Sequence, residues 1–154
     1  MPLSLFLLLP LSSSSSSSSL SPPLFSSSGF PVGIAIHSES STLAVADTGN
    51  DRIQLLSTSG RHLKTIRSGK EEEGRVKDVR FKSVHSIAIT RERIFMTDPK
   101  NNSIEVLARD GSRVLSIREE VELQQPTELL VVEEKIVVFS DMDGKRVQIM
   151  EPMT

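Results

Sequence analysis

The stretch that decides the fold is LAVADTGNDRIQLLS, from Leu43 to Ser57. Two short apolar runs flank the sequence Asp-Thr-Gly-Asn (47–50), and Asp, Gly and Asn are residues that tight turns prefer. Neither run has the apolar period of an amphipathic helix. The stretch therefore predicts two antiparallel strands joined by a tight turn.

The same pattern occurs twice more along the chain. The second unit contains IFMTDPKNNSIEVLA (94–108) and the third contains IVVFSDMDGKRVQIM (136–150). Alignment places Asp47, Asp98 and Asp141 in register, with offsets of 51 and 43 residues. The two offsets bracket the repeat period of a four-stranded propeller blade, which is about 45 residues.

Two strands of each unit carry further information. The first strand is almost continuously apolar, which is typical of an innermost strand buried on both faces. The third strand alternates, as in Ile53-Gln54-Leu55, which predicts one face on the core and one face toward solvent. In all three units the polar member of the alternation is Gln or Glu.

Unit one resembles the NHL repeat, whose pattern is Pro-x-Gly-Ile-Ala-Val followed by Val-Ala-Asp-Thr-Gly-Asn-x-Arg-Ile-Gln. PVGIAI (31–36) and VADTGNDRIQ (45–54) match this pattern almost residue for residue. The departures are Val84, Ser86, Lys100 and Ser103 in unit two and Glu128 in unit three. The resemblance covers residues 29–154, in repeats of about 29–69, 81–117 and 123–154.

The resemblance implies an all-β fold, a partial β-propeller of about three four-stranded NHL blades. NHL propellers commonly have six blades, and the third unit stops before its outermost strand, so eleven strands are expected where twelve would be complete. We therefore expect an open arc rather than a closed ring. Uncovered blade faces and strand edges favour self-association or a completing partner chain. A truncated product of a longer chain would leave the same arc.

The leader, residues 1–28, contains no charged residue. Its apolar run from Leu3 to Leu11 is too short for a membrane-spanning helix, which needs about 20 residues. The serine tract that follows predicts a disordered leader. A signal peptide is the weaker alternative, because no Lys or Arg precedes the apolar run. A cytoplasmic location is therefore favoured, with secretion as the alternative if the leader is a signal.

Composition excludes several classes of site. The chain has no Cys, which rules out disulfides, thiolate metal centres and a RING finger, so any ubiquitin-ligase role would need a RING-bearing parent chain. It has six Phe but no Trp or Tyr, which leaves few rings for base stacking. A net charge of −2 argues against a generally basic nucleic-acid binder.

The repeated aspartates are interpreted as structural. Asp47 is expected to accept hydrogen bonds from backbone N–H groups two residues further on, while Gly49 or Asn50 takes a positive φ. Because the aspartates recur at the same turn, this explanation is preferred to a ring of metal ligands, and neither a metal nor a cofactor is expected. The predicted turn residues are Asp47, Gly49, Asn50, Arg52, Asp98, Asn101, Asp141 and Arg146.

The segment 61–93 is locally basic, with ten basic and five acidic residues and a net charge of +5. In a propeller, the connection between blades lies at the same end as the turn between the second and third strands. RNA-binding NHL propellers hold single-stranded RNA on this loop face, so RNA binding is one hypothesis. The candidate ligand-binding or RNA-binding residues are Lys70, Arg75, Lys77, Arg80 and Lys82.

The favoured function is a non-catalytic module that binds a protein or peptide through the loop face, and no enzyme activity is expected. His37, His62 and His85 do not share a repeat position, and no phosphate loop or nucleophile elbow is present. The NHL family also includes metal-dependent peptide-amidating lyases, with histidines in the central channel. Such a site is the least favoured alternative, because the position of His85 is occupied by Val32 in unit one and by Thr127 in unit three.

Overall fold

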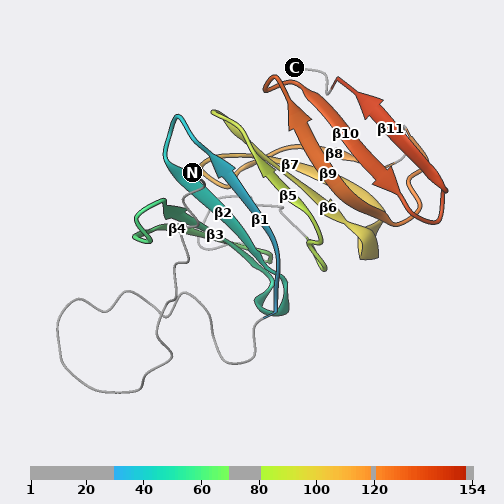
Figure 1. The fold of residues 1–154 in the computed structure, drawn as a ribbon. Coiled ribbons are helices and arrows are strands. Elements are labelled where there is room, and N and C mark those ends of the chain that lie inside the picture. The colour runs from blue at the N-terminus through green and yellow to red at the C-terminus, as the bar shows by residue number, and fades with distance from the viewer. Residues whose placement is uncertain (1–29, 70–80, 119–120, 152–154) are drawn as a thin grey trace, which may run out of the picture.

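A computed structural model describes residues 30–69, 81–118 and 121–151. These residues form eleven strands and two 3-10 turns, arranged in three groups along the chain (Figure 1). The first group contains β1 (Pro31–His37), β2 (Thr42–Asp47), η1 (Thr48–Asn50), β3 (Arg52–Ser57) and β4 (His62–Arg67). The second contains β5 (Ile87–Ile89), β6 (Arg93–Asp98), η2 (Pro99–Asn101), β7 (Ser103–Ala108) and β8 (Arg113–Ile117). The third contains β9 (Pro126–Val132), β10 (Ile136–Asp141) and β11 (Arg146–Met150).

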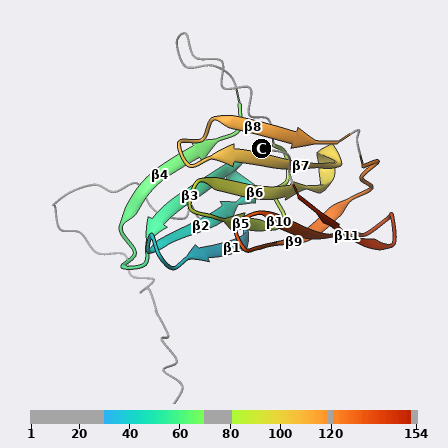
Figure 2. The same ribbon diagram turned by 90° about the horizontal axis from the view of Figure 1, so that it is seen from above.

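Each group is one antiparallel sheet, here called blade 1, blade 2 and blade 3. The strand orders are β1-β2-β3-β4, β5-β6-β7-β8 and β9-β10-β11, so consecutive strands are always neighbours. The first strands of the blades lie side by side, and the later strands fan outward from them (Figures 1 and 2). This confirms the predicted all-β partial propeller. In the described residues, blade 3 has three strands.

The core lies between the blades. We call the side of a blade that faces the preceding blade its leading face, and the side that faces the following blade its trailing face. The trailing face of blade 1 packs on the leading face of blade 2 in one apolar cluster. The trailing face of blade 2 packs on the leading face of blade 3 in a second cluster. The side chains in the first interface are Ala44, Ala46, Ile53, Leu55 and Ile66 against Ile87, Ile89, Ile94, Met96 and Leu107. Those in the second are Phe95, Ile104, Val106 and Ile117 against Leu129, Val137 and Phe139.

Gly33 explains how closely blades 1 and 2 approach. A Cβ atom at this position would lie 3.0 Å from the His85 carbonyl oxygen and 3.2 Å from the Ile87 Cγ2. A larger residue would therefore push β1 away from blade 2. The glycine of the first repeat unit is required by packing rather than by its backbone angles.

The prediction that every first strand is buried on both faces is wrong for two of the three blades. Alternate side chains of β1 and of β9 are exposed. The reason is the open arc: among the described residues, no blade packs against this side of β1 or against the far face of blade 3, although Val45 and Gln54 beside β1 are buried.

The prediction that the third strands turn a polar side chain toward solvent is also wrong for blades 1 and 2. Gln54 and Glu105 are almost completely buried. In blade 2 the carboxylate of Glu105 accepts a hydrogen bond from Ser116 (2.7 Å) and is 3.1 Å from Arg118 Nη2. A buried carboxylate needs such partners, and Ser116 of the outer strand β8 and Arg118 just after it supply them.

Two expectations fall partly or wholly outside the described residues. The leader, 1–28, is one of them. The other is the basic connector, in which Lys70, Arg75, Lys77 and Arg80 lie outside the described residues and Lys82 lies within them. In the part of the chain that the structure describes, no helix is long and apolar enough to cross a membrane.

Candidate functional site

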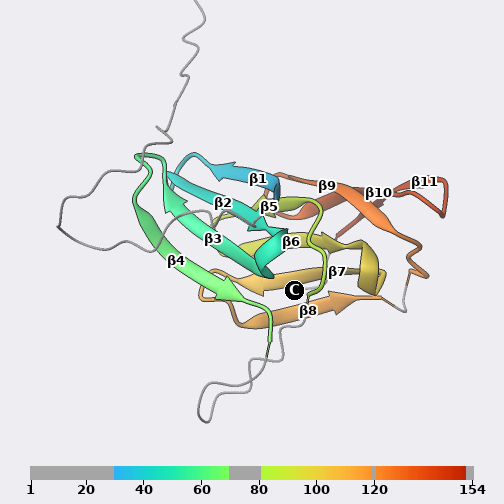
Figure 3. The same cartoon turned by 90° about the horizontal axis from the view of Figure 1, so that it is seen from below.

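The two ends of the blades carry different chemistry. One end, here called the Asp-turn end, holds the turns between second and third strands (48–51, 99–102 and 142–145). The other, the hairpin end, holds the turns between first and second strands (38–41, 90–92 and 133–135). Figure 1 shows the hairpin end at the top, and Figure 3 views the molecule from the Asp-turn end.

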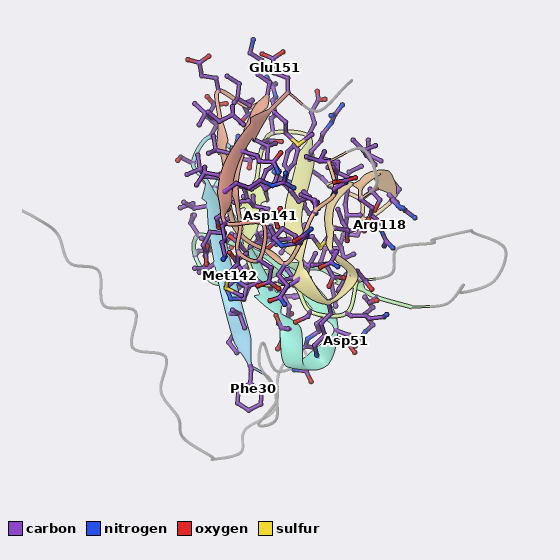
Figure 4. The ribbon with its side chains drawn as sticks, turned by 90° about the vertical axis from the view of Figure 1, so that its right-hand side faces the viewer. Phe30, Asp51, Arg118, Asp141, Met142 and Glu151 are labelled. Atoms are coloured by element: carbon purple, nitrogen blue, oxygen red, sulfur yellow. The ribbon has the colours of Figure 1, made fainter. Side chains whose placement is uncertain are left out.

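At the Asp-turn end, the three predicted aspartates occupy equivalent positions. Asp47, Asp98 and Asp141 each end the second strand of a blade and are completely buried. Figure 4 shows Asp141 within the body of the molecule, whereas Phe30 projects from the end of β1.

The positive φ angle falls later in the turn than expected. Asp51 has φ 47°, Asn102 has φ 49° and Lys145 has φ 50°, whereas Gly49 and Asn50 are not left-handed. The Asp51 N–H donates to the Thr48 carbonyl, so the three residues between Asp47 and Asp51 form one 3-10 turn. The left-handed residue then reverses the chain into the third strand.

The partners of Asp47 also differ from those expected. Asn50 Nδ2 donates to both carboxylate oxygens, at 2.9 and 3.0 Å, and Arg52 Nε donates at 2.6 Å. These donors are side chains rather than backbone groups two residues further on. Asp47 and Arg52 thus form a buried ion pair that closes the turn.

Blade 3 repeats this arrangement and extends it to the connection between blades. Arg146 Nε donates to Asp141 at 3.0 Å, and its Nη2 donates to the carbonyls of Val121 and Glu122 at 2.9 Å. The backbone N–H of Gln124 also donates to Asp141, at 2.7 Å. The Asp141–Arg146 pair therefore clamps the segment that enters blade 3.

Blade 2 lacks this arginine, because Ser103 stands at its position. Asp98 Oδ2 still accepts hydrogen bonds from the Lys82 backbone N–H (2.7 Å) and from Asn101 Nδ2 (2.6 Å). Asp98 Oδ1 and Ser103 Oγ, however, are buried and have no hydrogen-bond partner among the described residues. Lys82 thus contributes a backbone group to this turn, and its side chain is exposed.

At the hairpin end, polar side chains from all three blades meet. His37 Nδ1 is 2.8 Å from Ser40 Oγ, and His37 Nε2 is 3.1 Å from Glu134 Oε1. The Ser40 backbone N–H points at His37 Nδ1 (3.3 Å), which makes Nδ1 the acceptor and Nε2 the protonated nitrogen. Blade 2 joins through Arg109, whose Nη2 is 3.4 Å from Ser40 Oγ. We call these four residues the rim cluster.

Arg109 and Glu134 connect the rim cluster to the β5–β6 turn. Arg109 Nη1 donates to the Thr90 carbonyl at 2.7 Å, and Glu134 Oε2 accepts from the Arg91 N–H at 2.8 Å. Partial burial lowers the pKa of Arg109 below its usual range, and the charge of Glu134 acts in the opposite direction. These bonds leave the Glu134 carboxylate bridging blades 1 and 2.

A cavity of about 260 Å³ lies beside the rim cluster. Its lining carries charges of both signs around one aromatic ring. The lining residues are Thr90, Arg91, Glu92, Arg93, Phe95, Glu134 and Lys135.

The rim cluster was not predicted from the sequence. The sequence shows His37 only as a histidine without an equivalent in the other repeats, and Glu134 lies 97 residues away while Arg109 comes from a different blade. The repeat register could have shown that the turns 38–41, 90–92 and 133–135 lie at one end. It contains no signal that their side chains meet.

The comparisons with known proteins support the fold. No protein-family model matches the sequence, and no curated protein matches it. A streptogramin B lyase structure aligns with 79% of this chain and 37% of its own, at 19% identity and a TM-score of 0.56. Glutaminyl cyclase from Myxococcus xanthus aligns with 80% of this chain and 49% of its own, at 12% identity and a TM-score of 0.58. Virginiamycin B lyase from Staphylococcus aureus aligns with 82% of this chain and 42% of its own, at 13% identity and a TM-score of 0.56.

The chain therefore spans less than half the length of these propeller-like proteins. The comparison also corrects the expectation that the chain is not an enzyme. That expectation rested on the lack of a recognised catalytic motif in the sequence. The structural neighbours are lyases and a cyclase, so this arrangement of sheets occurs in enzymes. At 12 to 19% identity the likeness shows the fold alone.

Proposed function

We propose that this chain is an NHL-type propeller segment that binds a protein or peptide at its hairpin end. The observation that carries the proposal is the cavity beside the rim cluster. It has the size of a side-chain pocket, with the buried ring of Phe95 among its lining and exposed charges of both signs at Arg91, Glu92 and Lys135. A peptide offers apolar groups and both charges together, and it can satisfy such a lining.

This surface differs from the loop face expected from the sequence. At the Asp-turn end, the carboxylates of Asp47 and Asp141 are already bound to arginines of their own turns. At the hairpin end, the lining residues come from turns whose tips are exposed. The RNA alternative is not favoured, because four of its five candidate residues lie outside the described residues and the cavity at the hairpin end mixes Glu92 and Glu134 with its cations.

The test is selection of a random peptide library on the full chain, followed by affinity measurement of an enriched peptide. Replacing Lys135 by Glu reverses a charge in the cavity lining and should weaken binding by about tenfold or more. Lys145→Glu is the matched control, because Lys145 is an exposed lysine in the equivalent blade 3 turn at the opposite end. Enriched peptides that bind both variants equally would contradict the assignment of the surface.

A second candidate function, ester or amide hydrolysis, rests on the order of groups in the rim cluster. A hydroxyl (Ser40), an imidazole (His37) and a carboxylate (Glu134) form a continuous chain, which is the order of nucleophile, base and orienting group. In that reaction Ser40 Oγ would attack the carbonyl carbon while His37 Nδ1 takes its proton and returns it to the leaving group. Water would then release the acyl group and restore the serine.

The second candidate is tested with a fluorophosphonate probe on the full chain. Covalent labelling that disappears in Ser40→Ala and persists in Ser112→Ala would support it, since Ser112 is another turn serine, half-buried and bonded to a carboxylate, Asp110. Absence of labelling in the wild type would leave peptide binding without catalysis at this cluster. In that case the hydrogen bonds between Ser40 and His37 have a structural role, which is to stabilise the turn between β1 and β2.

A further inference from the structure

Two blade faces lack a neighbour in the part of the chain that the structure describes. The first is the β1 part of the leading face of blade 1, where Ile34 is 70% and Ile36 is 59% exposed. The second is the trailing face of blade 3, where Val147 is 70% and Ile149 is 73% exposed. Side chains of this size rarely gather on a surface that faces water permanently.

The repeat register shows what these exposed side chains do elsewhere in the molecule. Ile34 and Ile36 correspond to Ile87 and Ile89 of blade 2, which are 5% and 7% exposed because blade 1 covers them. Along β1, the leading face of blade 1 therefore presents the same residue types, in the same register, as a face that is buried by a preceding blade. Val45 and Gln54, on β2 and β3 of the same face, are already buried within the chain.

The trailing face of blade 3 gives the same result. Val147 corresponds to Ile53 and Ile104, both completely buried at interfaces with a following blade. Ile149 corresponds in the same way to Leu55 and Val106. Blade 3 thus presents one half of an interface whose other half is found on blade 1.

Two features around the trailing face of blade 3 agree with its being one half of an interface. Glu128 is the one charged residue at the position of Gly33 and Ser86, and its carboxylate lies 3.5 Å from His85 Nδ1 of blade 2, which offsets its charge when His85 is protonated. In addition, β11 pairs with β10 on one side and ends the described sheet on the other. An apolar face beside an open strand edge is a surface on which another chain can dock.

We propose that this surface binds a second copy of the same chain, head to tail. The trailing face of blade 3 in one copy packs on the leading face of blade 1 in the other, and the reverse contact closes the pair. Each contact repeats the geometry that joins blades 1 and 2 and blades 2 and 3 within one chain. Two copies supply six blades, and the two contacts are related by a two-fold axis, which gives a closed, discrete assembly.

The identity of the partner follows from the pairing rule inside the chain. Both internal interfaces join a trailing face to a leading face, and neither joins two faces of the same kind. A second copy supplies both missing faces at once.

The test is the solution mass of the full chain by native mass spectrometry and sedimentation. The wild type is expected to be a dimer. Ile149→Lys and Ile34→Glu each place a charge in one of the two contacting faces, and each should weaken association by about a hundredfold or more. Both positions are exposed within one chain, so circular dichroism of the variants should remain that of the wild type.

A mixture of the two variants separates head-to-tail pairing from other modes. The mixed pair has one unaltered contact and one that contains both Glu and Lys, whose opposite charges do not repel, so equimolar mixing should restore a dimer. Val114→Lys is the matched control, because Val114 is also an exposed apolar residue but lies on the outer strand β8 of blade 2.

Each other outcome overturns the proposal. A monomeric wild type, or oligomers larger than two, would exclude the closed pair. Dissociation by one of the two face variants alone would show that like faces meet. Dissociation by Val114→Lys would place the contact on the outer strands.

Discussion

Blades 2 and 3 are built from the same repeat but are stabilised differently. Blade 2 is covered on both faces, and Ile104 in its third strand is completely buried, whereas Val147 at the same position of blade 3 is 70% exposed. At the Asp-turn end, by contrast, blade 3 has the more complete set of interactions. Asp141 of blade 3 has an arginine partner, whereas one carboxylate oxygen of Asp98 in blade 2 has no hydrogen bond to any described residue. Burial of a repeat position is therefore decided by the neighbouring blade, and the closing of its turn is decided by the blade's own sequence.

The largest expected effect compares two isoleucine-to-alanine changes. Ile104→Ala should lower the free energy of unfolding by about 2 to 5 kcal/mol, because it opens a cavity in the second interface. Ile149→Ala removes the same atoms from an exposed side chain and should change it by less than about 0.5 kcal/mol. Urea denaturation at low protein concentration, where chains are separate, measures both. Equal losses would show that the two faces are covered alike in the single chain.

A smaller effect is expected from the clamp of blade 3. Arg146→Ala removes a charged donor from the buried Asp141 carboxylate and from the carbonyls of Val121 and Glu122. We expect a loss of about 2 kcal/mol. Arg118→Ala is a suitable comparison, because Arg118 also pairs with a buried carboxylate, Glu105, which retains Ser116 as a donor. Hydrogen exchange of the 121–125 segment should rise in the Arg146 variant alone, and unchanged exchange there would contradict the clamp.

The smallest effect is a gain in blade 2. Ser103→Arg restores the residue that the other two blades have at this position, and its guanidinium can donate to Asp98 Oδ1. We expect the free energy of unfolding to rise by about 1 kcal/mol. Ser103→Ala is the control, because it removes an unpartnered hydroxyl without supplying a donor. Thermal denaturation ranks the three proteins, and a Ser103→Arg protein that melts below the alanine variant would show that the side chain does not fit.

The sequence predicts the blades well because their signals are local. The turn residues after Asp47, Asp98 and Asp141 and the short apolar runs around them indicate three units of antiparallel strands. The burial of Gln54 and Glu105 was mispredicted, because alternation along a strand cannot show what covers its second face. The turn geometry was mispredicted by one or two residues, because Asp51 rather than Gly49 or Asn50 adopts the left-handed conformation.

The hairpin end could not be predicted for a related reason. His37 and Glu134 are brought together by the stacking of three blades, and no spacing within one unit encodes that contact. Arg52 and Arg146 were identified as turn residues from the repeat, but their role as partners of buried aspartates depends on the geometry of the completed turn.

The central claim is that the uncovered faces of blades 1 and 3 are two halves of one interface. The most direct test is the dependence of the melting temperature on protein concentration. A protein stabilised by association melts at a higher temperature as its concentration rises, because only folded chains associate and association therefore shifts the equilibrium toward the folded state. The account predicts such a rise for the wild-type chain and a concentration-independent melting temperature for Ile149→Lys. A wild-type melting temperature that stays constant across the same range of concentrations would contradict it.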